Sequence, residues 1–142
     1  MERDSRKRAE ALLAMTATEK VGQLNQHLYG FRIYHVEDGK IIFTQELKDE
    51  VKKWGGIGTI YGLYRADPWS EKNYETGLAG GLSMQAYNQL QKYVIEHSRL
   101  GIPFLLSSEC PHGHQALDGY LLPVNLAVGA SFDPALYERA GQ

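Results

Sequence analysis

The chain has 142 residues, of which 43% are hydrophobic and 23% are charged, and its formal net charge is -2. This length suits a single domain with a core of its own, and the composition argues against a disordered chain. The charge argues against nucleic acid as a partner, because the one basic cluster, residues 3–8, is interrupted by acidic residues.

The only cysteine and the N-terminal residues bear on the cellular compartment. A single cysteine, Cys110, excludes an internal disulfide and fits a reducing compartment. Residues 1–4 run directly into further charged residues with no apolar signal segment, and no run of about 20 apolar residues is present to span a bilayer. We therefore expect a soluble, cytoplasmic protein with no membrane partner.

The N-terminal part predicts two helices. The first covers residues 5–15. Thr16 and Glu19 have the spacing of a capping box and open the second. Its apolar residues follow at spacings of three and four, which predicts one buried face. These residues are Val21, Leu24 and Leu28.

The next segments predict a hairpin, a helix and a strand. Residues 33–44 form a β-hairpin, since Asp38-Gly39 supplies a positive-φ turn between two apolar runs. Residues 46–54 form a short amphipathic helix that Gly55-Gly56 ends. Residues 57–61 are rich in β-branched side chains and form the strand.

A long irregular segment, residues 62–82, separates this strand from a strong helix. Ser83 caps the helix, which extends to about Ser98. A second apolar strand covers residues 103–107, and Asp133-Pro134 opens a final helix. The buried stripe of the long helix is predicted to be Met84, Tyr87, Leu90 and Val94.

The order of these elements predicts an α/β fold. Strand, long loop, helix, strand, loop and helix follow one another, as in βα units with a parallel sheet. The apolar run 102–106 is typical of a buried parallel strand. About two such units are present, after an N-terminal helical segment and a β-hairpin, and that number is too small to close a barrel.

The residues that follow the second strand gather a carboxylate, a thiol and two imidazoles. One interpretation is a metal site, since Cys110, His112 and His114 alternate along the chain. Pro111 and Gly113 favour a turn instead, and no second cluster of ligands occurs elsewhere. We therefore predict neither a metal nor a cofactor.

Three other interpretations apply to the same stretch. Cys110 as a nucleophile would need a base, and His112 is only two residues away, whereas such pairs normally come from separate elements. Serine hydrolase chemistry has no support, because no Gly-x-Ser-x-Gly elbow is present. Alternatively, His112 and His114 hydrogen-bond to backbone groups and only stabilise the loop. Finally, Glu109 at the strand end has the acceptor oxygens that suit the hydroxyls of a sugar.

An ordered set of strings resembles the N-terminal catalytic domain of glycoside hydrolase family 3, which includes β-glucosidases and β-xylosidases. The set covers most of the chain from about Thr16 onward. Its later members are the Leu-Gly-Ile-Pro of residues 100–103, Glu109 with His112-Gly113, and the Phe-Asp-Pro of residues 132–134. Its earlier members are Gly-Gly-Ile-Gly (55–58), Tyr-Gly-Leu-Tyr-Arg-Ala-Asp-Pro (61–68) and the run 93–101.

The resemblance implies a (β/α)₈-type barrel and a sugar-binding site. The family usually has an aspartate three residues before the His-Gly, where it binds sugar hydroxyls, and Glu109 takes that position here. We expect Glu109 and His112 to bind substrate, together with residues on the loop after the preceding strand. Those residues are Arg65, Asp67 and Trp69, with Tyr64 as a second ring for stacking; packing or surface placement is the alternative for these four.

The resemblance also implies that this chain lacks the catalytic pair. In the family, the nucleophile is an aspartate on a later strand, commonly within Ser-Asp-Trp, and the acid/base follows later still. No such string occurs here, and a barrel needs about 250 residues. We expect residues 1–142 to be an incomplete N-terminal portion of a retaining β-glucosidase-like barrel, inactive alone.

The expected partners follow from the same resemblance. They are a β-glycoside or monosaccharide, and either another chain at the open strand edges or the remainder of the barrel. The alternative is a non-catalytic carbohydrate-binding or interaction module derived from the same fold.

Overall fold

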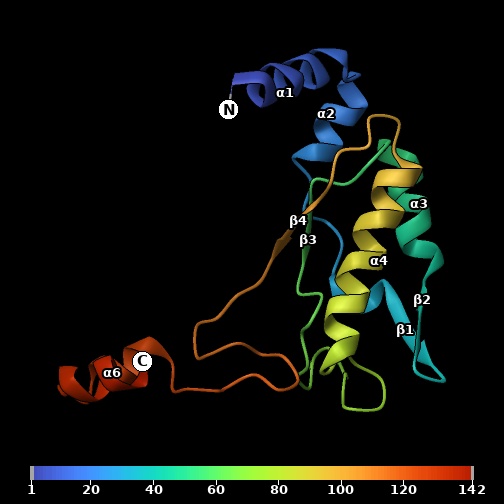
Figure 1. The fold of residues 1–142 in the computed structure, drawn as a ribbon. Coiled ribbons are helices and arrows are strands. Elements are labelled where there is room, and N and C mark those ends of the chain that lie inside the picture. Colours follow the sequence, from blue (N-terminus) through green and yellow to red (C-terminus); the bar gives the residue numbers. More distant parts are fainter. Residues whose placement is uncertain (1, 142) are drawn as a thin grey trace.

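A computed structural model describes residues 2–141 as a mixed α/β fold with two small sheets (Figure 1). None of the described helices is both long and apolar enough to cross a lipid bilayer. In chain order the elements are α1 (Glu2–Ala14), α2 (Ala17–Gln23), the 3-10 turn η1 (Gly30–Arg32), β1 (Tyr34–Glu37), β2 (Lys40–Phe43), α3 (Gln45–Trp54), β3 (Thr59–Tyr61), α4 (Gly81–His97), β4 (Leu105–Ser107), α5 (Asn125–Gly129) and α6 (Pro134–Ala140).

Strands β3 and β4 form the parallel pair that the βα order predicts. Tyr61, the last residue of β3, lies opposite Ser107, the last residue of β4. The N–H of Tyr61 also donates to the carbonyl oxygen of Leu28 at 3.3 Å, so the chain before η1 follows the other edge of β3. Three parallel segments therefore lie side by side, and they form no closed barrel within residues 2–141.

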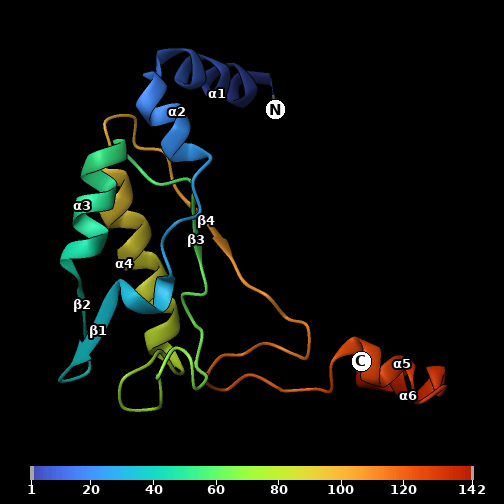
Figure 2. The ribbon, with the colours of Figure 1, turned by 180° about the vertical axis from the view of Figure 1, so that it is seen from behind.

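Helices cover one face of this pair and leave the other open. In both ribbon views α3 and α4 lie on the same side of β3 and β4 (Figures 1 and 2). Phe104 and Ile60 are buried on that side, whereas Leu105 is 71% exposed. The predicted burial of the whole run 102–106 is therefore wrong, because neighbouring residues of a strand point to opposite faces and only one face is covered.

The N-terminal prediction is confirmed at the cap and corrected beyond it. Thr16 and Glu19 form the capping box, with distances of 2.7 and 3.2 Å. Helix α2 ends at Gln23, so Leu28 is buried in the extended segment beside β3 and not on the helix. The backbones are close there: a Cβ at Gly58 would overlap the carbonyl oxygen of Gln23. The two other residues of the predicted buried face, Val21 and Leu24, are exposed.

The hairpin and α3 follow their local signals. The turn residues Asp38 and Gly39 have φ values of 50° and 70°, and Gly55 ends α3 with a φ of 67°. Side chains from both elements enter the core with those of η1, β3 and α4. The fully buried members of this core include Ile33, Leu47, Val51, Ile60, Leu90 and Val94.

Helix α4 starts earlier and buries a different stripe than predicted. It begins at Gly81 with Gly80 as its cap, and the hydroxyl of Ser83 donates back to the Leu78 carbonyl at 3.2 Å. The buried residues of the helix are Ala86, Leu90 and Val94, at spacings of four. Met84 is 70% exposed, so its place in the predicted stripe is wrong.

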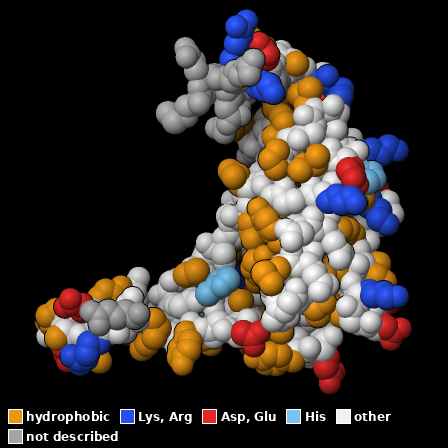
Figure 3. All heavy atoms as spheres, viewed as in Figure 1, with side chains coloured by type: hydrophobic (Ala, Val, Ile, Leu, Met, Phe, Trp, Pro, Cys, Tyr) orange, Lys and Arg blue, Asp and Glu red, His pale blue; other side chains and the backbone are white. Residues whose placement is uncertain are grey.

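Residues 108–141 form an arm that first returns to the loop after β3, where the N–H of Ala66 donates to the Gln115 carbonyl at 2.9 Å. The rest of the arm, with α5 and α6, extends away from the sheet and its helices (Figures 1 and 2). Helices α5 and α6 contain no buried residue. The predicted cap of the last helix is confirmed, since Asp133 Oδ1 accepts from the N–H of Leu136 at 2.9 Å. Figure 3 shows hydrophobic side chains at the surface of the arm and of the adjoining flank of the body.

Candidate functional site

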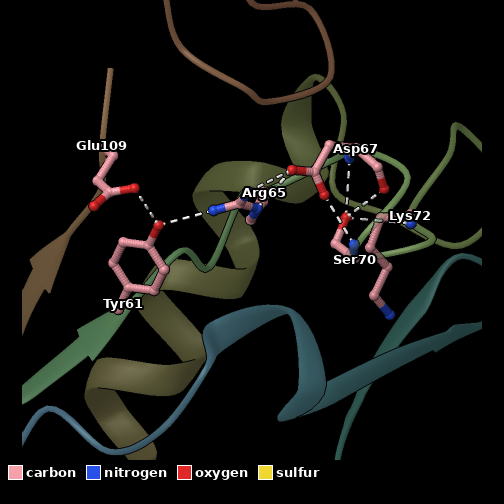
Figure 4. Close-up of polar contacts among 6 residues, drawn as sticks. All are labelled: Tyr61, Arg65, Asp67, Ser70, Lys72 and Glu109. Atoms are coloured by element: carbon pink, nitrogen blue, oxygen red, sulfur yellow. Dashed lines mark hydrogen bonds and ion pairs between the residues drawn. The ribbon is translucent and has the colours of Figure 1, made fainter. Parts of the chain in front are cut away.

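Four polar side chains form one hydrogen-bonded network at the carboxyl edge of the parallel pair (Figure 4). Tyr61 ends β3, Glu109 lies two residues beyond β4, and Arg65 and Asp67 follow β3 on its loop. Parallel strands finish at the same edge of a sheet, so residues that are distant in sequence meet there. The structure thus brings three of the predicted site residues into one network, together with Tyr61.

Glu109 is linked to Arg65 through the hydroxyl of Tyr61. Arg65 Nη1 donates to Tyr61 Oη at 2.8 Å, and Tyr61 Oη donates to Glu109 Oε2 at 2.9 Å. Burial and the hydrogen bond to Glu109 raise the pKa of Tyr61 above its ordinary value, although the Arg65 charge opposes them. The hydroxyl therefore remains protonated and able to donate at neutral pH.

Asp67 is held by Arg65 and by its own loop. Arg65 Nε and Nη2 lie 2.7 and 2.6 Å from Asp67 Oδ2, and the N–H of Ser70 donates to Oδ1 at 2.8 Å. Burial of Asp67 raises its pKa, but the hydrogen bonds from Arg65 and Ser70 outweigh that effect and lower it. The side chain is only 9% exposed, so Asp67 anchors the guanidinium in place.

Aromatic rings lie beside the guanidinium of Arg65. Arg65 Cζ is 4.5 Å from the centroid of the Trp69 ring, which suits a cation–π contact. The Trp69 ring also meets the rings of Tyr29 and Phe31 at centroid distances of 5.1 and 5.0 Å, and it is 49% exposed. Trp69 thus borders the network, and part of its ring surface is accessible to solvent. Tyr64 instead packs against the core and donates to the Ser83 carbonyl of α4.

The two histidines after Glu109 take part in the loop. His114 Nε2 lies 3.1 Å from Ser108 Oγ, and the carbonyl of His112 accepts from the N–H of Leu122 at 2.6 Å. In the described part of the chain, no hydrogen bond joins the His112 ring to Glu109 or Tyr61. Cys110 is exposed. Over residues 2–141, no group of three or more His, Cys, Asp or Glu side chains is arranged to hold a metal ion.

A large hollow of the surface lies elsewhere, on the arm. It has a volume of about 790 Å³ between the loop after Cys110 and helices α5 and α6. None of the four network residues lines it, and its walls are mainly apolar side chains such as Leu122, Val128 and Leu136. The network therefore offers the donors and acceptors that a polar ligand requires, whereas the hollow is mainly apolar.

Sequence reasoning missed Tyr61 and Tyr29. The only signal for Tyr61 is that it is the last residue of a predicted strand. In a parallel pair, this position lies at the same edge of the sheet as the end of the next strand. Tyr29 comes directly after the segment predicted as the second helix, and it meets Tyr61 only because residues 28 and 29 follow the edge of β3.

The chain was compared with known proteins. No family model matches it, and no curated protein matches it significantly. The resemblance to glycoside hydrolase family 3 therefore depends on the ordered residue strings alone, and the activity it implies is a proposal.

Proposed function

We propose that this chain supplies part of the sugar-binding wall of a β-glucosidase-like glycoside hydrolase, in which Glu109 accepts hydrogen bonds from hydroxyls of a terminal β-linked sugar. One observation carries the proposal. Glu109 is exposed at the strand-end edge with Oε2 held by Tyr61, and within residues 2–141 its Oε1 accepts no hydrogen bond.

The surroundings of Glu109 suit a sugar. A carboxylate oxygen accepts from one or two hydroxyl groups, and Arg65, anchored by Asp67, orients the Tyr61 hydroxyl that holds Glu109. The half-exposed ring of Trp69 offers an apolar surface of the kind on which the C–H face of a pyranose packs. In the proposal Glu109 binds hydroxyls, while Asp67 fixes Arg65 and Arg65 orients the Tyr61 hydroxyl.

The network supports binding and not turnover by the chain alone. A retaining mechanism requires two carboxyl groups about 5 Å apart, one as nucleophile and one as acid/base. Of the network's two carboxylates, Asp67 is already occupied by Arg65 and Ser70. The catalytic pair would come from the rest of such a barrel.

The occupied state of Asp67 also favours a second candidate function, a non-catalytic carbohydrate-binding module. Turnover of a nitrophenyl β-glucoside separates the two. If the remaining part of a family 3 barrel, added as a separate chain, restores turnover, the enzyme is supported. Saturable glucose binding with no turnover under those conditions supports the module.

Calorimetric titration with glucose tests the role of Glu109. We expect Glu109→Gln to raise the Kd by about tenfold or more, because a charged acceptor is replaced by a neutral one. Asp118→Asn is the matched control, since Asp118 is an exposed carboxylate that also accepts from a tyrosine, Tyr74, at 3.0 Å. The control is expected to stay within about twofold of the parent. Absence of saturable binding, or an equal Kd for Glu109→Gln and the parent, contradicts the proposal.

A further inference from the structure

We propose that Tyr61 is the positioning residue of this site: its hydroxyl, oriented by Arg65, fixes Glu109 Oε2 and leaves Oε1 as the acceptor that meets a sugar hydroxyl. The inference rests on the proposed function and deepens it, because it states which atom meets the ligand and what holds that atom in place.

The direction of the hydrogen bonds follows from the chemistry of the three groups. A guanidinium has donors and no acceptor, so Arg65 Nη1 must donate to the oxygen of Tyr61. The Tyr61 proton then points to the next acceptor, which is Glu109 Oε2 at 2.9 Å. The relay has one orientation only, because its first member cannot reverse.

The first two members of the relay, Arg65 and Tyr61, are fixed independently of Glu109. Arg65 is held by the two contacts of its Nε and Nη2 atoms with Asp67. Tyr61 lies on β3 between Leu28 and Ser107, and its ring meets that of Tyr29 at a centroid distance of 6.1 Å. Glu109 lies on a loop outside any strand, so the Tyr61 hydroxyl is the contact that restricts its rotamer.

The arrangement sets a requirement on the ligand. Oε1 only accepts, so the group that meets it must donate, and a hydroxyl does so whereas a methoxy group does not. It also sets a requirement on the length of the side chain. Glu109→Asp shortens the carboxylate's reach by about 1.5 Å, which exceeds what the bond to Tyr61 tolerates.

The competing explanation is that Tyr61 merely joins the loop after β4 to β3. Tyr74 provides the matched control for that explanation, because its hydroxyl also donates to a carboxylate across the chain, Asp118 Oδ1 at 3.0 Å. Tyr74→Phe and Tyr61→Phe remove the same atom from the same kind of bond. Only Tyr61→Phe removes it from the proposed site.

Calorimetric titration of the full chain with glucose makes the comparison. We expect Tyr61→Phe to raise the Kd about tenfold and Tyr74→Phe to leave it within about twofold. Adding Tyr61→Phe to Glu109→Gln is expected to weaken binding no further, because the two residues act as one unit. If Tyr61→Phe binds like the parent while Glu109→Gln does not, the inference fails and the proposed function stands.

A measurement without ligand distinguishes a failure of the positioning role of Tyr61 from a failure of the proposed function. The titration of the Tyr61 ring is followed by NMR of the labelled Cζ carbon, assigned by its absence in Tyr61→Phe. We expect Glu109→Gln to lower the Tyr61 pKa toward its ordinary value, because one cause of its elevation is removed, and Asp118→Asn to leave it unchanged. If no chain binds glucose, the proposed function fails; an unchanged Tyr61 pKa in Glu109→Gln overturns the positioning role itself.

Discussion

At the scale of single residues, Glu19 ties the N-terminal helices to the rest of the fold. Its carboxylate caps α2 and also accepts from Arg99 Nε and Nη2 at 2.8 and 2.7 Å. Arg99 lies between α4 and β4, and its Nη2 also donates to the Ala14 carbonyl at the end of α1. This ion pair therefore joins the α1–α2 region to the segment between α4 and β4.

The Glu19–Arg99 pair predicts a loss of stability in acid. Hydrogen bonds from Arg99 and Thr16 lower the pKa of Glu19 from 4.5 to about 2 in the folded chain. A folded-state pKa below the unfolded one contributes stability above about pH 4.5, and this is lost as the pH falls toward 2. We expect Glu19→Gln to unfold at lower urea concentration than the parent at pH 7, with the difference shrinking below pH 4.5.

The exposed Glu75 provides the control for this experiment. Glu75→Gln is expected to follow the parent curve across the whole range. A Glu19→Gln deficit that stays constant from pH 7 to pH 3 would show that lost packing, and not the charge, is the cause.

At the scale of elements, α4 shows how the sheet selects one face of a helix. Its sequence offers several apolar stripes, and the structure buries Ala86, Leu90 and Val94 against the core. Tyr87 is partly buried beside them, and its ring meets Phe104, which leads into β4, at 6.0 Å. The helix thereby packs against the segment that enters β4 and leads to Glu109.

Two truncations on α4 test this orientation. Leu90→Ala is expected to lower the free energy of unfolding by about 3 kcal/mol, because it leaves a cavity at a fully buried position. Met84→Ala on the same helix is expected to cost less than about 0.5 kcal/mol, since Met84 faces solvent. Urea denaturation of the two variants checks this, and equal losses would contradict the orientation.

At the scale of the whole molecule, apolar surface remains uncovered on the open sheet face and on the arm. Leu105 lies on β4, whose outer edge pairs with no strand of residues 2–141. The arm adds Tyr120, Leu126 and Phe132, all exposed. Unpaired strand edges and contiguous apolar surface are sites of association.

We therefore expect the chain to associate in a concentration-dependent way. Leu105→Lys places a charge on the open strand and is expected to shift the sedimentation profile toward monomer. Leu13→Lys, at an exposed position on α1, is the control and is expected to change the profile less. A parent chain that sediments as one monomeric species and melts in a sharp cooperative transition would contradict the expectation.

The sequence by itself determined the local structures. The turn at Asp38-Gly39, the cap at Gly55, the Thr16–Glu19 box and the Asp133 cap are all confirmed. Each depends on backbone conformation or hydrogen bonds within about four residues, which the local sequence specifies. The order of strands and helices also predicted the parallel pair of β3 and β4, since a crossover through a helix permits little else.

Only the tertiary structure decided which apolar residues are buried and which polar residues meet. Phe104 and Leu105 are both large apolar residues of the predicted strand. Phe104 is buried because it lies on the covered face, and Leu105 is exposed because it lies on the open face. The Tyr61–Glu109 hydrogen bond joins residues 48 positions apart, and it exists because two parallel strands end at one edge. Such contacts depend on which segments lie side by side, and short-range sequence patterns do not contain that information.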